Sequence, residues 1–293
     1  MPISGATTIV ICGNRHQDNY LPKINDMIRL MLDAGISVYI ERRFADYMAS
    51  MTPDILQRCR ITDTPPPHTH VAVSIGGDGT FLRTARWIGR GGIPVLGINT
   101  GHLGFLAGYT LDEAPSLIDM LLNHTGIIEE RIVLQVESPD IPADILPFAL
   151  NEVAILKEDT SSMISVHLTL NDFLLADYMA DGLIISTPTG STGYNLAVGG
   201  PILQPTLQAL SIAPIAPHTL TLRPIIIGSN SVLHAVTTSR ATHYRVSLDG
   251  CSFVMTVGTS LTVRRADFSI RTLRRSDTDF AATLRNKLLW GQR

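Results

Sequence analysis

The chain has 293 residues and a mass of 31.9 kDa, which is enough for two domains. Hydrophobic residues make up 45% and charged residues 17%, which is typical of a folded globular protein and excludes long disordered segments. A net charge of −3 gives no overall basic field, so nucleic acid is not an expected partner.

Cellular location can be inferred from the cysteines and from the apolar runs. The three cysteines, Cys12, Cys59 and Cys251, are an odd number without C-x-x-C spacing, which favours neither a disulfide framework nor a zinc site. The first residues lack the basic segment of a signal peptide, and no apolar run reaches the ~18 residues needed to cross a bilayer. We therefore expect a soluble, cytoplasmic protein without a membrane partner.

Strands alternate with helices in the first 126 residues. A β-branched run at 7–13 is followed by a helical pattern at 21–35 and by a second strand pattern at 36–40. A buried strand at 71–75 then leads through a glycine turn into a helix, expected from about Phe81 to Ile88, and the strand 93–99 follows. This alternation predicts a Rossmann-like parallel sheet with helices on both faces, the fold of an α/β nucleotide-binding domain.

The pattern changes after residue 126. Residues 127–276 consist of short runs of Val, Ile, Leu and Thr separated by turn residues, including one at 219–227, and predict a mostly β domain. Residues 277–293 predict a closing helix, with Phe280, Leu284 and Leu288 at helical spacing, which we expect to join the first domain. The arginines at positions 264, 265, 271, 274 and 275 recur as on solvated strand faces, so we do not interpret them as an anion-binding patch.

The glycine turn lies in the segment SIGGDGTFLRTA, residues 74–85, between a strand and a helix. In that context backbone N–H groups can hold phosphate. The loop residues that we assign to phosphate are Gly76, Gly77, Gly79 and Thr80. The carboxylate of Asp78 would repel phosphate, so its presence in the turn indicates another task, such as accepting a proton from a hydroxyl group or holding a metal ion. The alternative is that Asp78 only supplies turn or cap chemistry. The turn lacks a Walker lysine and a G-x-G-x-x-G pattern, which disfavours dehydrogenase chemistry.

Two further segments combine polar groups with apolar strands. Residues 180–203 contain a dense run of Ser, Thr and Gly after a strand, which suits a polar or phosphorylated ligand, although a hydroxyl-rich hairpin turn would look the same. Asn151 and Glu152 lie inside an apolar run, where they would need partners if buried; an exposed strand bulge is the alternative. The loop after the strand 93–99 lies where open sheets bind ligands.

Five segments together resemble the NAD kinase family of the bacterial type, in the same order and at similar separations. They are GGDGT (76–80), NTGHLGFL (99–106), NE (151–152), DGLIISTPTGSTGY (181–194) and PHTLTLRPI (217–225). Similar GGDGT loops also occur in lipid kinases and phosphofructokinases, so the combination is what makes the resemblance specific. It covers nearly the whole chain.

The resemblance implies transfer of the γ-phosphoryl group of ATP to the 2′-hydroxyl of the adenosine ribose of NAD, giving NADP. It makes Asp78 the base for that hydroxyl and lets Gly79 and the loop amides hold phosphate. Arg83 is expected to point at phosphate or else to occupy a surface position of the helix. Mg²⁺ or another divalent cation is expected to arrive with ATP, and no side chain is assigned as its ligand.

The resemblance also implies an NAD site. Phe105 matches an aromatic residue beside the adenine, and Asn151 and Glu152 match the pair that binds ribose hydroxyls. Further matching positions are Asp181, Thr189, Thr192, Gly193, Tyr194, Asn195, Leu196, Ala197 and, through its backbone, Ala216. Gly193 replaces the alanine usual in the family, and Cys251 replaces a polar residue. Since family members are dimers or tetramers, a homodimer or homotetramer is expected.

Two other hypotheses remain open on the sequence alone. One is a lipid or sugar kinase that shares the glycine turn, although the hydroxyl-rich segment does not suit an acyl chain. The other is a non-enzymatic module that senses NAD, which would have no need of Asp78. The phosphoryl donor, ATP or polyphosphate, and the preference between NAD and NADH are also left open.

Overall fold

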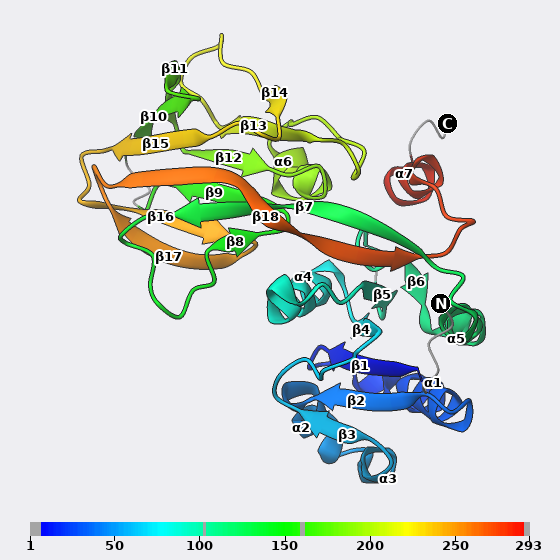
Figure 1. The fold of residues 1–293 in the computed structure, drawn as a ribbon. Helices are drawn as coiled ribbons and strands as arrows, with labels where there is room; N and C mark the ends of the chain where they lie inside the picture. Colours follow the sequence, from blue (N-terminus) through cyan, green and yellow to red (C-terminus); the bar gives the residue numbers. More distant parts are fainter. Residues whose placement is uncertain (1–6, 102–103, 159–161, 290–293) are drawn as a thin grey trace. The chain divides into compact units, whose positions relative to one another are not determined.

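The chain forms two compact units in the computed structural model, which describes residues 7–101, 104–158 and 162–289 (Figure 1). The first unit comprises Met1–Glu130 and Ile270–Arg293, and the second comprises Arg131–Ser269. The chain therefore passes from the first unit to the second after residue 130 and returns to the first after residue 269. The sequence patterns predicted these domain limits after residues 126 and 276.

The first unit is built on a parallel sheet in the order β3-β2-β1-β4-β5. Its strands are β1 (Thr8–Gly13), β2 (Ser37–Glu41), β3 (Arg60–Thr62), β4 (Val71–Ile75) and β5 (Val95–Asn99), and the short β6 (Tyr109–Thr110) pairs with β5. The chain adds strands on one side of β1 up to β3 and then returns to add β4 on the other side. The order thus reverses between β1 and β4, and open sheets bind ligands at the carboxyl ends of the strands beside such a reversal.

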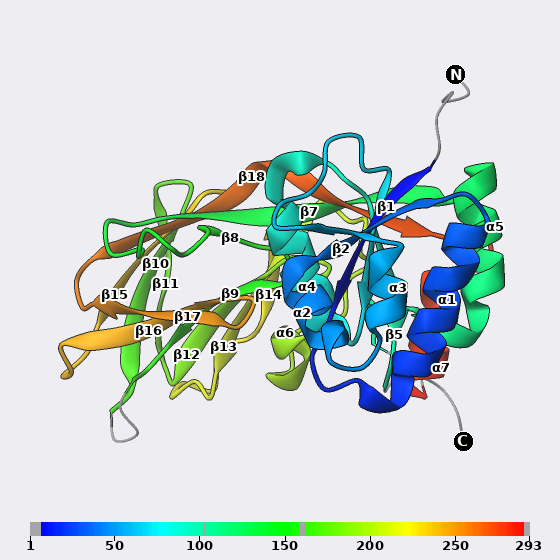
Figure 2. The same ribbon diagram turned by 90° about the horizontal axis from the view of Figure 1, so that it is seen from below.

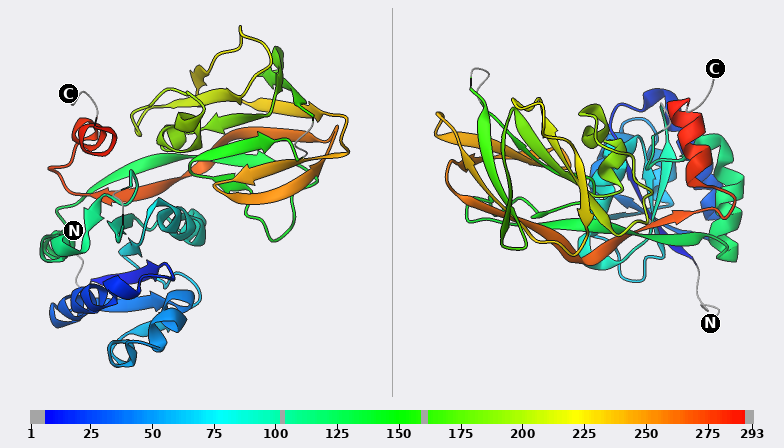
Figure 3. Two further views of the ribbon diagram at one scale, coloured as in Figure 1. Left: turned by 180° about the vertical axis from the view of Figure 1, so that it is seen from behind. Right: turned by 90° about the horizontal axis from the view of Figure 1, so that it is seen from above.

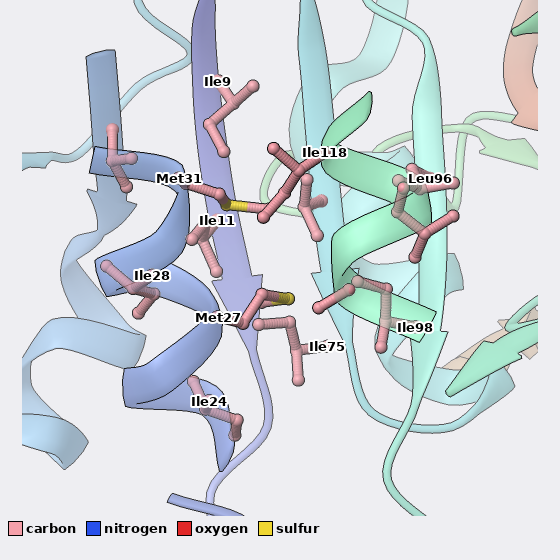
Figure 4. Packing of buried hydrophobic residues seen from close by; sticks show 14 of the residues in the cluster. Ile9, Ile11, Ile24, Met27, Ile28, Met31, Ile75, Leu96, Ile98 and Ile118 are labelled. Atoms are coloured by element: carbon pink, nitrogen blue, oxygen red, sulfur yellow. The ribbon is translucent and has the colours of Figure 1, made fainter. Parts of the chain in front are cut away.

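Helices cover both faces of this sheet. They are α1 (Leu21–Asp33), α2 (Arg42–Ala49), α3 (Pro53–Gln57), α4 (Asp78–Ile88) and α5 (Ala114–Asn123), with 3-10 turns at Asp18–Tyr20, Gly89–Gly91 and Leu111–Glu113. Helix α7 (Phe280–Leu288), which has no buried residue, also belongs to this unit. On one face α1 and α5 lie side by side (Figure 2) and share a core with Leu96 and Ile98 of β5 (Figure 4). On the other face Phe81 of α4 packs against Gly97, since alternate residues of a strand point to opposite faces.

The helical periodicity of α1 shows why this face is stable. Ile24, Met27, Ile28 and Met31 are spaced one helical turn apart, and each is at most 1% exposed. Burying a side chain of this kind contributes about 1.5–3 kcal/mol, so this single stripe is enough to hold α1 on the sheet.

The second unit contains two antiparallel layers (Figure 3). One is a sheet in the order β14-β13-β12-β9-β16-β17; the other runs β11-β10-β15-β18, with β7 beside β18 and β8 beside β7. The strands are β7 (Ile127–Glu137), β8 (Phe148–Ala149), β9 (Glu152–Leu156), β10 (Ile164–Leu170), β11 (Phe173–Ala180), β12 (Gly182–Ser186), β13 (Ala209–Ile215), β14 (Ile225–Gly228), β15 (Leu233–Thr238), β16 (His243–Leu248), β17 (Cys251–Thr256) and β18 (Ser260–Arg274). Both layers contribute to one core, for example Val166 from β10 and Ile185 from β12. The turn at Gly190–Thr192 and the short helix α6 (Tyr194–Ala197) follow β12.

The predicted fold class is confirmed: a parallel α/β part, a mostly β part and a closing helix. Two element boundaries differ from the prediction. Helix α4 begins at Asp78 and not near Phe81, so the glycine turn already contains the first helical turn. In the run 219–227 only the end is a strand, because Pro224 lacks a backbone N–H and Leu220, at 86% exposed, has no core to face.

The five clustered arginines are all paired within their own units. Their partners are Glu137 for Arg264, Gln208 for Arg265, Glu130 for Arg271, Glu129 for Arg274 and Asp277 for Arg275. Among the described residues, no helix is long and apolar enough to cross a membrane.

Candidate functional site

Asp78 opens helix α4 at the reversal point of the first unit's sheet. Its carboxylate accepts three backbone N–H bonds from the loop after β5: Phe105 at 2.8 Å to Oδ2, and Leu106 at 2.9 Å and Ala107 at 3.0 Å to Oδ1. Asp78 is the first residue of α4, and the N-cap position before it is Gly77. Because a carboxylate offers about four acceptor positions, one position on Oδ2 is left for a ligand hydroxyl.

Two glycines are required for this arrangement. A Cβ on Gly104 would collide with the carboxylate of Asp78, and a Cβ on Gly76, at φ +149°, would collide with the side chain of Thr80. Thr80 itself is 6% exposed, so it packs under the turn and does not line an open loop. In contrast, a Cβ on Gly77 or Gly79 would meet no protein atom within 4 Å. His102 and Leu103 of the predicted motif lie outside the described residues.

Arg83 bridges helix α4 and the ends of two strands. Its guanidinium donates to Glu41 Oε1 at 2.8 Å and to the carbonyl oxygen of Gly13 at 2.6 Å. Arg83 is therefore not a surface position, and its side chain is directed to the ends of β1 and β2. Its contact with phosphate stays a prediction.

A polar pocket of about 300 Å³ lies beside this bridge, within the first unit. It is lined by Arg15, Glu41, Arg42, Arg43, Asp46, Asp63 and Trp87. Arg42 pairs with Asp63, and Arg83 pairs with Glu41. With three arginines and three carboxylates in its lining, the pocket has no net charge and does not by itself select an anion.

Asn151 and Glu152 are held in the second unit by a residue that the sequence did not single out. Asp249 accepts the backbone N–H groups of Leu150 at 2.6 Å, Asn151 at 2.8 Å and Glu152 at 3.1 Å. It lies at φ +50° in the tight turn between β16 and β17. The polar pair is therefore fixed in place and is not a loose bulge. The signal that could have identified Asp249 is the Asp-Gly turn at 249–250.

The turn after β12 packs on this pair. The backbone N–H of Thr187 donates to the carbonyl oxygen of Asn151 at 2.9 Å, and a Cβ on Gly193 would lie 3.2 Å from Glu152 Oε2. Among the described residues, three buried atoms here have no hydrogen-bond partner: Asn151 Oδ1, Glu152 Oε2 and Thr189 Oγ1. Since an unsatisfied buried polar atom costs about 1–3 kcal/mol, this cluster is suited to a ligand rich in hydroxyl groups.

Burial and, to a smaller extent, the nearby charge of Asp249 raise the pKa of Glu152 to about 7, against a hydrogen bond from the backbone of Tyr194 that lowers it. The carboxyl group is therefore close to half protonated at neutral pH. In that state it can either donate or accept a hydrogen bond.

Replacing Glu152 by glutamine is expected to flatten the dependence of stability on pH in the ligand-free protein. Because the pKa of Glu152 is about 7 in the folded state and that of an ordinary glutamate is 4.5, the folded state binds more protons between these two pH values. The stability contributed by protonated Glu152 is thus complete below pH 4.5 and lost as pH rises through 7. The change should be on the order of 2 kcal/mol, allowing for partial exposure of the side chain. Urea unfolding at pH 5, 6, 7 and 8 measures it; parallel curves for wild type and Glu152→Gln would contradict the assignment.

The other predicted NAD-site residues of this unit have different environments. The side chain of Asn195 is fully buried and fully bonded, to Ser191, Pro201 and Ser211, so it holds the turn together. Asp181 forms an ion pair with Lys157 at 2.6 Å. Of the remaining positions, Tyr194 and Ala197 are exposed, Thr192 and Leu196 are partly buried, and Ala216 is exposed. Ala216 has φ +44°, a costly conformation for a residue other than glycine.

A metal ion, if present, does not have a ready cluster of side chains. In the described part of the chain, no group of three or more His, Cys, Asp or Glu residues could hold one. Since the one acceptor position left on Asp78 is the position for a ligand hydroxyl, a cation would be held mostly by substrate phosphates and water. The divalent cation stays a prediction.

An open parallel sheet with a glycine turn at its reversal point, together with a polar, hydroxyl-rich cluster, is typical of a nucleotide-binding protein. Residues 9–126 match the family model for the ATP-NAD kinase N-terminal domain, and residues 150–274 match the model for the ATP-NAD kinase C-terminal domain.

Curated relatives agree with this match over nearly the full length. The NAD kinase of Porphyromonas gingivalis is 42% identical over 97% of this chain and 98% of its own. The NAD kinase of Bacteroides fragilis is 41% identical over 96% of this chain and 97% of its own. The chain belongs to the NAD kinase family.

Solved structures show the same fold. Yeast NADH kinase, complexed with NADH, superposes with a TM-score of 0.86 at 21% identity, covering 99% of this chain and 90% of that one. An NAD kinase from Archaeoglobus fulgidus, in complex with ATP, superposes with a TM-score of 0.71 at 22% identity, covering 92% and 94%. The resemblance inferred from the motifs is thus confirmed, while the roles of single site residues stay predictions.

Proposed function

We propose that this protein transfers the γ-phosphoryl group of ATP to the 2′-hydroxyl of the adenosine ribose of NAD. The hydroxyl oxygen forms the new P–O bond, the bond to the β-phosphate breaks, and NADP and ADP leave. The observation that best supports this is Asp78, a carboxylate fixed by three amides at the reversal point with one acceptor position free. The high identity to NAD kinases supports the substrate.

Asp78 takes the proton of the hydroxyl group in this proposal. A base held within hydrogen-bond reach needs no reorientation, and its three amide bonds prevent rotation away from the substrate. The N–H groups of Thr80 and Phe81 bond to the carbonyl oxygen of Gly77, so in this proposal the backbone of the exposed Gly77 and Gly79 meets the phosphate oxygens. Mg²⁺ bound with ATP would neutralise phosphate charge, which is the main requirement of phosphoryl transfer.

The polar cluster of the second unit binds NAD in this proposal. Asn151 and Glu152 have unpartnered atoms that suit ribose hydroxyls, and Tyr194, at 40% exposed, offers a ring for stacking. Gly193, in place of the usual alanine, leaves about one carbon atom of extra room beside Glu152. We further propose a cytoplasmic homodimer or homotetramer, on the resemblance to the family.

A coupled assay tests the proposal. Purified protein is given NAD, ATP and Mg²⁺, and NADP is read through an NADP-specific dehydrogenase. Formation of NADP supports the kinase; NAD binding by calorimetry without NADP would favour a sensor. If NAD does not bind either, a lipid or sugar kinase becomes the next hypothesis. Replacing ATP by polyphosphate, and NAD by NADH, defines the donor and acceptor.

A further inference from the structure

Helix α7, the last helix described, brings one lysine to Phe105, in the loop of the first unit that binds Asp78. The helix begins at Phe280, and Asp279 caps it by accepting the backbone N–H of Ala282 at 2.6 Å. Lys287, in the last turn, lies with its ammonium 5.0 Å from the centre of the Phe105 ring. Phe105 is the residue whose N–H binds Asp78 Oδ2, so the same loop residue contacts both charges.

The surroundings of Lys287 are only partly solvated. Burial lowers the pKa of its ammonium to about 8, and the carboxylate of Asp78 opposes this by raising it. A half-buried cation over an aromatic ring interacts more strongly with charge than one in water does. Of the described residues, Asp78 is the one whose charge acts on Lys287.

The glycine turn needs such a charge. Phosphoryl transfer spreads negative charge over three oxygens, and catalysis depends on positive groups already in position. Arg83, the basic residue nearest in sequence, is bonded to Glu41 and Gly13. Lys287 is instead contributed from more than two hundred positions further along the chain.

We propose that Lys287 contacts the phosphoryl group during its transfer and is a catalytic residue of this kinase. This inference rests on the proposed function. It assigns to the closing helix a part in the chemistry that the motifs of the family resemblance do not include.

The test compares three variants in the NADP assay. Lys287→Met is expected to lower kcat by about 100-fold, with KM for NAD changed less than threefold, because the charge acts on the transferring group. Lys287→Arg, which keeps the charge, is expected to stay within tenfold of wild type. Arg285→Met is the matched control, since Arg285 is an exposed cation of the same helix, and its kcat should be unchanged.

The pH profile separates catalysis from packing. Asp78 is the charged group that acts on Lys287, so kcat/KM for ATP of the wild type, which reports the groups of the enzyme before ATP binds, should fall as pH rises through about 8, where the ammonium loses its proton. In Lys287→Arg this fall should move to higher pH, since arginine stays charged. A kcat of Lys287→Met within threefold of wild type, or the same fall near pH 8 in Lys287→Arg, would overturn the inference. Absence of NADP with the wild type would instead reject the proposed function.

Discussion

Replacing Asp78 by asparagine is expected to lower kcat about 1,000-fold, within the usual range for loss of a general base. An amide cannot take the hydroxyl proton. It also cannot accept all three backbone bonds, because its NH₂ group would face the N–H of Phe105 or those of Leu106 and Ala107. Steady-state kinetics at saturating NAD and ATP measure the loss.

Two measurements accompany this prediction. Calorimetry of Asp78→Asn with NAD should give a Kd within a few fold of wild type, because the proposed ribose contacts belong to Asn151 and Glu152. Asp54→Asn is the control, since Asp54 is an exposed carboxylate in the first turn of α3, and its kcat should not change. Full activity of Asp78→Asn would show that the carboxylate is not the base.

Replacing Asp249 by asparagine is expected to raise KM for NAD by 10- to 100-fold. Asparagine tolerates φ +50°, so the backbone of the turn should survive. Three N–H groups, those of Leu150, Asn151 and Glu152, then share one carbonyl oxygen, and the pair is no longer held rigidly. A loss of one charged hydrogen bond is worth about 1.5–3 kcal/mol, which corresponds to this range.

The same change should lower the pKa of Glu152, because one of the two causes that raise it is the charge of Asp249. The dependence of NAD affinity on pH should therefore shift to lower pH. Asp172→Asn is the matched control, since Asp172 is an exposed turn aspartate at φ +70° between β10 and β11. An unchanged KM for NAD in Asp249→Asn would show that Asp249 does not position the site.

The order of elements and the family could be inferred from the sequence because they depend on local patterns. The strand-glycine-helix pattern around Asp78 predicted a turn suited to phosphate, and the helical spacing over residues 21–35 predicted α1. What could not be inferred depends on contacts between distant residues. Asp249 lies 97 positions beyond Glu152, and Lys287 lies 182 positions beyond Phe105.

Arg83 illustrates the same limit. Its position one turn into α4 suggested either a phosphate contact or a solvent-facing residue, and neither interpretation included the two protein partners that the structure shows. The carbonyl oxygen of Gly13 and the carboxylate of Glu41 become its partners only once β1 and β2 lie next to α4. A helical pattern gives the face on which a side chain lies, but not the acceptor that it meets there.

The glycines around Asp78 divide into two kinds with different evolutionary freedom. Any side chain at Gly76 or Gly104 collides with Thr80 or with Asp78 itself, so changes there would be removed by selection for folding alone. Gly77 and Gly79 face open space, and a methyl group would fit the protein without its substrates. These two positions can therefore be constrained only by what the protein binds. A lineage that abandoned phosphoryl transfer would be free to lose them while keeping the first pair.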